Sequence, residues 1–487
     1  MPPGRLPADD RLPQAAGGVT VSYQPVSHED HPRDTLLSLA HDGERTADPA
    51  IPPRWPFKVY LPRTTDDVVR AVREVRGRDE RLIVRGHGHS SNDLVTGDGA
   101  TVLVTGRMSQ IVDVDERGRT VTVQGGAILS EVDAHLAERG WGLPVIGDHD
   151  RITAGGFASV GGISPASHRY GLFVDTVKEL EYVDWDGEVH VCGRDRDPGR
   201  FHRVLAGTGR HGVITWLKID LVRVDKHRTV LRNHLLFTND LDDYLRRSAE
   251  LVRDPGDALM ERGVWADFPT PLGALRLGQF SSYRQTPQNP LKSLLNGAAH
   301  GSQQLLGRWA RRLPAADELV KYLGMAEIMF SPLYASGKNV ERLTDPTAGE
   351  PARTLAVLAP AERYEILFRR LYDVAVEERR DSGGITFVSM HVKAIRSGYL
   401  SQGEDGRRHC ELMLHFGVNP AQLTEKVLER LVERVDDLVI DNGGFRCMHT
   451  RTSASPERRR LLDPNARYAE DAGKPRGKGV TGTTGKV

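Results

Sequence analysis

Residues 85–92 read RGHGHSSN and combine residue types that can hold a phosphate group. Glycine permits positive φ and close approach of the backbone to a ligand, and successive backbone N–H groups in such a loop form an anion-binding nest. The hydroxyls of Ser90 and Ser91 add donors, and the imidazole of His87 or His89 stands beside them. The loop predicts a site for a phosphate-bearing ligand; the alternative is an ordinary tight turn.

Two further groups of side chains could do acid–base or binding chemistry. Asp148 lies in a Gly-Asp-His-Asp run that ends at Asp150. His391 and Lys393 alternate with apolar residues on one expected strand, and His415 does so on another. Because alternate residues of a strand share a face, His391 and Lys393 point the same way, toward either solvent or a polar pocket.

Residues 152–177 form a second glycine-rich stretch, ITAGGFASVGGISPASHRYGLFVDTV. Its glycines are interleaved with small residues, which indicates backbone packed closely against a flat, rigid body. A flexible linker would be more polar and would lack Phe157, Ile163 and Tyr170. The stretch is therefore expected to be structured.

Residues 207–212 match the pattern GxGxxG of dinucleotide-binding turns. That fingerprint follows a strand and opens a helix. Here a helix-like segment, residues 201–206, comes first and a strand-like segment, residues 213–224, follows. We do not expect a nicotinamide site at this position.

The elements that must position these residues alternate between helix and strand in the first half of the chain. Residues 64–67, Thr-Thr-Asp-Asp, supply N-cap chemistry for a helix whose valines recur at helical spacing. Short strands are expected on both sides of the 85–92 loop and in a later hairpin. The expected strands are residues 82–84, 101–104, 111–114, 120–123, 177–183 and 189–192, with a helix over residues 128–140.

After residue 225 the pattern changes to strands separated by long helices, which predicts an α+β part with an antiparallel sheet. The expected strands are residues 229–237, 263–268, 275–280, 385–395 and 411–416, and the helices are residues 240–252, 361–379 and 420–439. We divide the chain into a lead-in (residues 1–54), a first domain (55–225), a second domain (226–450), a return to the first domain (451–470) and a disordered tail (471–487).

Composition narrows the class of protein. The 487 residues carry 66 basic and 66 acidic side chains, so the net charge gives no footprint for nucleic acid. No run approaches the roughly 20 apolar residues of a membrane span, and the first residues lack a signal-peptide pattern. The three cysteines are far apart, which argues against a disulfide framework or a zinc site. We expect a cytoplasmic protein without a metal centre.

Taken together, these stretches resemble the vanillyl-alcohol oxidase/PCMH-type flavoproteins. RGHGHSSN is similar to the pyrophosphate loop of that family, residues 155–183 to its flavin-wrapping segment, and residues 201–215 to the end of its FAD domain. The resemblance implies a two-subdomain PCMH-type FAD-binding domain and an α+β substrate domain. In many members the histidine of GHS is bonded to the flavin 8α-methyl, and His89 holds that position. The implied FAD-binding residues are Arg85, Gly86, His87, Gly88, His89, Ser90, Ser91, Asn92, Gly155, Gly156, Ser159, Gly161, Gly162, Ser164, Tyr170, Gly171, Val213 and Ile214.

Within the family, the spacing of Gly155 and the motifs after it most resembles cytokinin dehydrogenases. Those enzymes place a catalytic aspartate seven residues before the first of these glycines, and Asp148 holds that position, although His149 replaces their neighbouring aromatic residue. Residues 411–416 and 462–468 resemble alditol and aldonolactone oxidases instead. Where those enzymes carry Glu-x-Arg on a strand facing the substrate, this chain has His391-x-Lys393.

The resemblance implies an FAD-dependent oxidoreductase that removes hydride from the CH–OH carbon of a polar small molecule. Asp148 would be the base, with Asp150 as the alternative, His391 and Lys393 would act beside it, and His415 would bind the substrate. O2 or a quinone-type acceptor would reoxidise the flavin. Oxidation of a CH–NH amine, a non-covalent reductase and a flavin-binding protein without redox turnover remain as alternatives.

Overall fold

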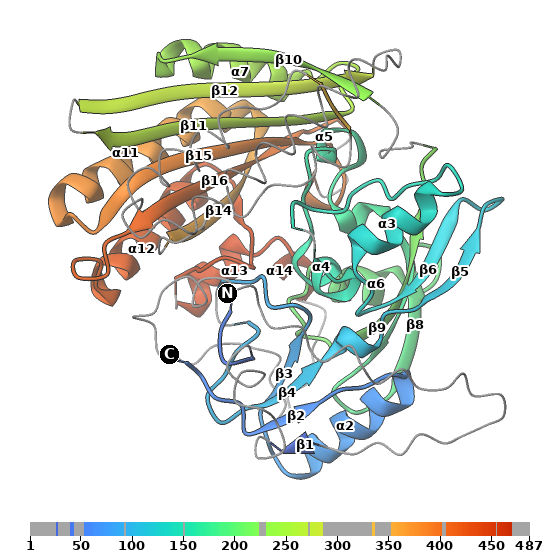
Figure 1. The fold of residues 1–487 in the computed structure, drawn as a ribbon. Coiled ribbons are helices and arrows are strands. Elements are labelled where there is room, and N and C mark those ends of the chain that lie inside the picture. Colours follow the sequence, from blue (N-terminus) through green and yellow to red (C-terminus); the bar gives the residue numbers. More distant parts are fainter. Residues whose placement is uncertain are drawn as a thin grey trace, which may run out of the picture.

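The computed structural model describes residues 26–27, 39–42, 53–91, 94–149, 151–223, 230–270, 273–285, 334–336, 352–401, 406–453 and 455–469. We call residues 53–223 the N-terminal region and residues 230–453 the cap region. Figure 1 shows the large sheet of the cap region beside two smaller sheets of the N-terminal region. Asn92, Asp150 and the expected disordered tail lie outside the described residues.

One small sheet places the 85–92 loop. It has the order β1 (Val26–Ser27), β2 (Lys58–Tyr60), β4 (Thr101–Val104) and β3 (Leu82–Arg85), and β4 runs parallel to both β2 and β3. Helix α2 (Thr65–Gly77) starts at a capping box in which the Thr64 hydroxyl accepts from the backbone N–H of Asp67, and it buries its valine face. The loop therefore begins where β3 ends, as the sequence predicted.

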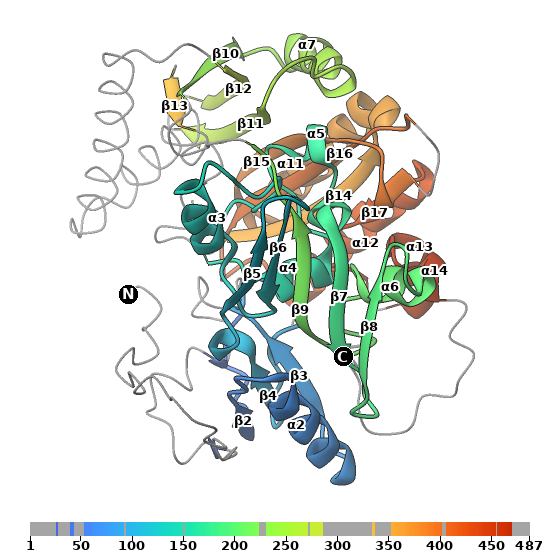
Figure 2. The same cartoon turned by 90° about the vertical axis from the view of Figure 1, so that its right-hand side faces the viewer.

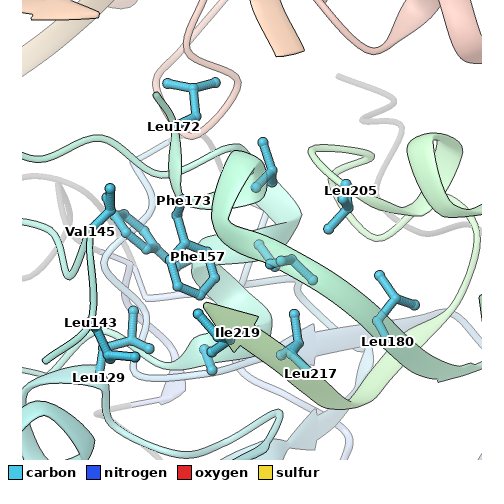
Figure 3. Close-up of a cluster of buried hydrophobic side chains, with 14 of the residues drawn as sticks. Leu129, Leu143, Val145, Phe157, Leu172, Phe173, Leu180, Leu205, Leu217 and Ile219 are labelled. Carbon is cyan, nitrogen blue, oxygen red and sulfur yellow. The ribbon is translucent and has the colours of Figure 1, made fainter. Parts of the chain in front are cut away.

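The second small sheet is antiparallel and holds the core of the N-terminal region. Its order is β5 (Ile111–Asp115), β6 (Thr120–Gln124), β9 (Val213–Asp220), β7 (Val177–Val183) and β8 (Val189–Gly193). Phe157 and Phe173 pack with Leu217 and Ile219 of β9 in this core (Figure 3). The connections contain η2 (Thr105–Arg107), α3 (Leu129–Ala137), α4 (Ala154–Val160), α5 (Ser167–Tyr170), η3 (Phe173–Thr176) and α6 (Pro198–Val204).

The cap region is an eight-stranded antiparallel sheet, so the predicted α+β class is confirmed. Its strands, in spatial order, are β13 (Tyr334–Ser336), β10 (Val230–Thr238), β12 (Gly273–Gln285), β11 (Met260–Thr270), β15 (Ile385–Ile395), β16 (His409–Val418), β14 (Ala352–Pro360) and β17 (Phe445–Arg446). Three of them, β13, β14 and β17, were not expected from the sequence. Short turns η4 (Ala361–Arg363) and η5 (Tyr399–Ser401) flank the strands.

The two faces of this sheet have different neighbours. One face is covered by the helices α7 (Leu241–Arg253), α11 (Tyr364–Ser382) and α12 (Glu425–Asp441). They pack on apolar side chains of the strands, such as Trp265 of β11 and Phe280 of β12. The other face meets the N-terminal region, where the backbone N–H of Glu261 donates to Pro165 O at 2.8 Å and that of Arg396 donates to Ser167 O at 2.9 Å. Figure 2 shows α5 against this sheet. Polar side chains on the second face therefore lie between the two regions.

Beyond the cap region, α13 (Pro456–Leu462) packs on α12 and β17, and α14 (Ala466–Ala469) contacts α6 of the N-terminal region. The buried amide of Asn465 donates to Leu205 O at 2.7 Å, and Arg210 forms an ion pair with Asp463. Both contacts hold the loop after α6. Within the described part of the chain, no helix combines the length and the apolar character needed to cross a membrane.

Candidate functional site

The two glycine-rich stretches meet at Thr153. A Cβ atom on Gly86 would overlap the Thr153 hydroxyl, and a Cβ on Gly156 would lie 2.7 Å from the same atom. Only glycine lets the backbone of the 85–91 loop and the first turn of α4 approach Thr153 this closely. The sequence singled out both stretches, and the structure places them side by side.

A pocket opens between these stretches and the two small sheets. Its walls come from β3, the 85–91 loop, α4 and the start of β9. Glycine backbone and serine hydroxyls supply donors without bulk, which suits an elongated, phosphate-bearing ligand. The predicted cofactor residues that line it are Gly86, Ser90, Gly155, Gly156, Ser159, Val213 and Ile214.

The buried side chain of Arg85 packs against the backbone of the loop. Its side chain is buried, its guanidinium donates to Val95 O at 3.1 Å, and a Cβ on Gly88 would overlap that guanidinium. Burial lowers the pKa of Arg85 to about 10 against the opposing charge of Asp42. The glycine at position 88, with φ of +81°, leaves room for this arginine. Arg85 thus shapes the loop and does not line the pocket.

The histidines of the loop have different surroundings. His87 is half-buried, and burial together with the charges of Arg151 and Arg85 lowers its pKa to about 4. His89 is exposed and stacks on His149, with ring centroids 5.0 Å apart. This contact brings His89 next to the residue that follows Asp148.

The backbone of Ser91 connects the loop to a segment of the cap region that is distant in sequence. Its N–H donates to His449 O at 2.8 Å. Burial and the charges of His149, Lys393 and Arg446 lower the pKa of His449 to about 4. Residues 447–450 of the cap region therefore contact the loop, and nothing in the sequence indicated this contact.

Five other predicted cofactor residues pack on the chain itself. A Cβ on Gly162 would lie 2.6 Å from Phe173 Cβ and 2.7 Å from Phe157, and one on Gly171 would overlap Asp175. Ser164 accepts from the N–H of Ala166 at 3.1 Å and so shapes the turn before α5. The close packing expected for this stretch is made largely by protein side chains. Gly161, Gly162, Ser164, Tyr170 and Gly171 do not line the pocket, and their contact with a cofactor stays a prediction.

Asp148 meets the cap region at Lys393. The Lys393 ammonium donates to Asp148 Oδ2 and, at 2.9 Å, to Glu411 Oε2, and all three side chains are at most 10% exposed. Burial alone would lower the pKa of Lys393, but the carboxylates of Asp148 and Glu411 outweigh it and raise that pKa. The other Asp148 oxygen, Oδ1, is buried and has no hydrogen-bond partner within the described residues. Lys393 thus holds Oδ2 of this carboxylate, and Oδ1 is available to accept a hydrogen bond or a proton.

The two histidines of the cap sheet lie beside this group. His391 Nε2 lies 3.0 Å from the Ser389 hydroxyl, and its ring meets that of His415 edge to face at 6.3 Å. His415 Nδ1 lies 3.0 Å from the Thr354 hydroxyl. Burial first, then the charges of His415 and Lys393, hold the pKa of His391 well below its usual value. The structure therefore brings the predicted His391, Lys393 and His415 onto one wall with Asp148.

Sequence reasoning missed several residues of the site. Glu411 shares a strand face with His415 because the two are four residues apart on β16, and that alternation was the available signal. Thr208, Gly209 and Gly212 line the pocket although their GxGxxG pattern is not a dinucleotide fingerprint. Gly125 also lines it, and a Cβ there would overlap the carbonyl oxygen of Ile214.

Comparison with known proteins agrees with this geometry. Residues 56–193 match the family described as "FAD binding domain". An "Uncharacterized oxidoreductase ORF5 in fasciation locus" of Rhodococcoides fascians is 34% identical over 202 residues, which cover 41% of this chain and 45% of that protein. Cytokinin dehydrogenase 5 of Arabidopsis thaliana is 31% identical over 270 residues, 52% of this chain and 49% of that protein. D-arabinono-1,4-lactone oxidase of Eremothecium gossypii is 30% identical over 173 residues, 34% and 32% of the two chains.

The chain thus spans about half the length, or less, of these curated relatives. The matched residues contain the 85–92 loop, Asp148 and α4, which line or adjoin the pocket described above. Residues 56–193 are thus similar to an FAD-binding domain, and parts of this chain are similar to a cytokinin dehydrogenase and to a lactone oxidase.

Proposed function

We propose that this protein is an FAD-dependent oxidoreductase that oxidises a CH–OH carbon of a polar, hydroxylated small molecule. The FAD pyrophosphate would lie against the 85–91 loop and α4, where glycine backbone and serine hydroxyls supply donors. Bound FAD would supply the hydride acceptor. The remaining chemistry falls to side chains of this chain.

The observation that carries this proposal is the carboxylate of Asp148. Lys393 fixes Oδ2, which leaves the buried Oδ1 to take the hydroxyl proton of the substrate as hydride leaves the carbon. Glu411 holds Lys393 from the other side. A positioned base of this kind typically contributes about 10²–10⁴-fold to the rate.

The wall beside Asp148 supports a hydroxylated substrate. Ser389, His391 and His415 are buried polar groups that make this face of the sheet polar, and the bond between His391 and Ser389 leaves further lone pairs and a ring nitrogen for a substrate. Several hydroxyls of a polyol or sugar could partner them, whereas a flat apolar molecule offers few. The neutral imidazole of His391 can accept a hydrogen bond from a hydroxyl and remains uncharged next to Lys393.

We also propose that FAD is attached through His89. This side chain is exposed and stacks on His149, next to Asp148. A ring nitrogen of His89 would hold the flavin covalently in place of its N–H proton, and O2 or a quinone-type acceptor would take up the two electrons that this attachment releases. That same acceptor would complete each catalytic cycle.

The test is the variant Asp148→Asn, which keeps the shape of the side chain and removes its basicity. We expect flavin reduction in anaerobic stopped-flow experiments to slow by about 10²–10⁴-fold, with FAD content and the visible spectrum unchanged. Asp113→Asn, an exposed strand residue, is the matched control. A variant that reduces its flavin within a few-fold of wild type would remove Asp148 from the mechanism and bring Asp150 forward.

A second candidate is oxidation of a CH–NH amine. It is favoured by the relatives named cytokinin dehydrogenases and by the position of Asp148 before the glycine pair. A panel of polyols, sugars, aldonolactones and N-alkyl adenines separates the two reactions. Faster flavin reduction by an N-alkyl adenine than by every hydroxylated compound would establish the amine reaction.

A further inference from the structure

The face of the cap sheet that carries Lys393 continues beyond the base. On β15, β11 and β12, His391 pairs with Val264 and Val264 pairs with Gln279, so these side chains share one face. Ser281, the next residue on that face of β12, pairs with Arg262. Since neighbouring strands are about 4.8 Å apart, Ser281 lies roughly 10 Å from the level of Lys393 across the sheet.

Three buried polar side chains meet at that position. The amides of Asn233 and Gln279 both donate to the Ser281 hydroxyl oxygen, at 3.2 Å and 3.0 Å. All three residues are at most 4% exposed. The carbonyl oxygens Asn233 Oδ1 and Gln279 Oε1 are buried without a hydrogen-bond partner in the described part of the chain. Two acceptor oxygens on the sheet face that carries His391 therefore have no donor among the described residues.

Asn233, Gln279 and Ser281 lie on the face of the cap sheet that meets the N-terminal region. Leu231 and Tyr283, which share their strand face, pack on Ala166 of the N-terminal region. In the other direction along β10, Leu235 and Phe237 are 41% and 52% exposed, and Phe237 pairs with Gln279. The polar group thus lies between a packed contact and a solvent-exposed edge of the same face.

We propose that Asn233, Gln279 and Ser281 form a distal subsite that binds a hydroxyl-bearing end of the substrate. This rests on the proposed function, because the reacting carbon at Asp148 fixes the other end of the molecule. The subsite selects elongated polyhydroxylated substrates, such as glycosylated alditols, over short ones. A hydroxyl suits it because it can donate to either amide oxygen and also accept.

The first test uses stability and needs no substrate. A buried acceptor without a donor destabilises the folded state, so Gln279→Met, which is similar in shape, should raise the thermal unfolding midpoint of the FAD-bound protein by roughly 1–2 °C. The control Ser248→Ala removes a buried hydroxyl that is partnered, 2.8 Å from Tyr364 Oη on the helix-covered side, and should lower it. A Gln279→Met protein that unfolds below wild type would mean that the amide serves the fold, and the subsite would be overturned.

The second test measures anaerobic flavin reduction with glycerol, sorbitol and maltitol. In Gln279→Met and Asn233→Leu, the maltitol concentration that gives half the maximal rate of flavin reduction should rise about 3- to 10-fold, which is the effect of one neutral hydrogen bond. The half-saturating concentration of glycerol should stay unchanged. Equal changes for short and long alcohols, or no change, would overturn the subsite. Failure of all three alcohols to reduce the wild-type flavin would count against the CH–OH proposal instead, and the stability test would then decide the subsite.

Discussion

The carboxylate of Asp148 and the ammonium of Lys393 form a buried ion pair although 245 residues separate them in the chain. Asp148 belongs to the N-terminal region and Lys393 to the cap sheet. Because Glu411 binds the same ammonium at 2.9 Å, one cation balances two carboxylates. The candidate site is therefore assembled only when the two regions are packed together.

Removing the shared cation should disturb both carboxylates. In Lys393→Met, Asp148 and Glu411 would face each other without a counter-charge, and breaking a buried pair costs about 3–5 kcal/mol. We expect a lower free energy of unfolding in urea and slower flavin reduction. The double variant Lys393→Met/Glu411→Gln should recover part of the stability. Equal stability of the single variant and wild type would contradict this account.

Filling the pocket should prevent cofactor binding. Ser159 lines the pocket, and its hydroxyl donates to Gly155 O at 2.7 Å within α4. Ser159→Phe adds a ring where FAD is expected, so we predict that FAD content falls at least about tenfold, which corresponds to about 1.4 kcal/mol. Ser159→Ala loses only the helix contact and should bind FAD within a few-fold of wild type. Equal FAD content in both variants would place the cofactor elsewhere.

Mass spectrometry of the denatured protein tests the proposed covalent bond between His89 and the flavin. Denatured wild-type protein should carry the mass of one FAD, and His89→Ala should lack it while still binding FAD, because the other donors of the loop remain. His87→Ala is the control, since this half-buried side chain does not stack on His149. A wild-type polypeptide without an FAD adduct would exclude covalent attachment.

Buried neutral histidines should make stability depend on pH. The pKa of folded His391 lies well below its usual value because of burial and the charges of His415 and Lys393. The unfolded chain therefore binds the extra proton first, and stability present above pH 6.5 is lost as the pH falls, by up to about 1.4 kcal/mol per pH unit for one proton. His391→Gln should take up about one proton fewer on unfolding at pH 5.5 than wild type. An unchanged proton uptake would mean that His391 is already charged in the folded protein.

A second buried pair should matter for stability alone. Arg446 and Asp436 are fully buried and paired, and Arg446 also donates to Ala356 O at 3.0 Å. Asp436→Asn leaves the guanidinium without its counter-charge, so we expect a loss of about 3–5 kcal/mol in urea unfolding. Replacing both residues, as Asp436→Leu with Arg446→Met, should cost less than the single change. The reverse order would indicate that packing, not charge, dominates there.

The sequence by itself determined the local elements. Alternation and helical spacing predicted strands β3, β4, β7 and β15 within one residue of their observed ends, because periodicity reflects which face is buried. Helix α4 was not expected, since its two glycines and small side chains give no helical pattern. Strand β14 was also missed, because its buried apolar run from Leu355 to Ala359 does not alternate, and periodicity alone does not separate such a run from a buried helix.

The sequence also identified the residue types of the site but not their partners. The glycines at 86 and 156 marked close backbone approach, and His391, Lys393 and His415 were recognised by alternation on their strands. Tertiary structure alone decided that Thr153 lies between the glycine stretches and that Glu411 shares the Lys393 ammonium with Asp148. The physical reason is that periodicity fixes which face of an element is buried, whereas contacts between distant segments depend on how those faces pack, and a strand pattern contains no information about its partner.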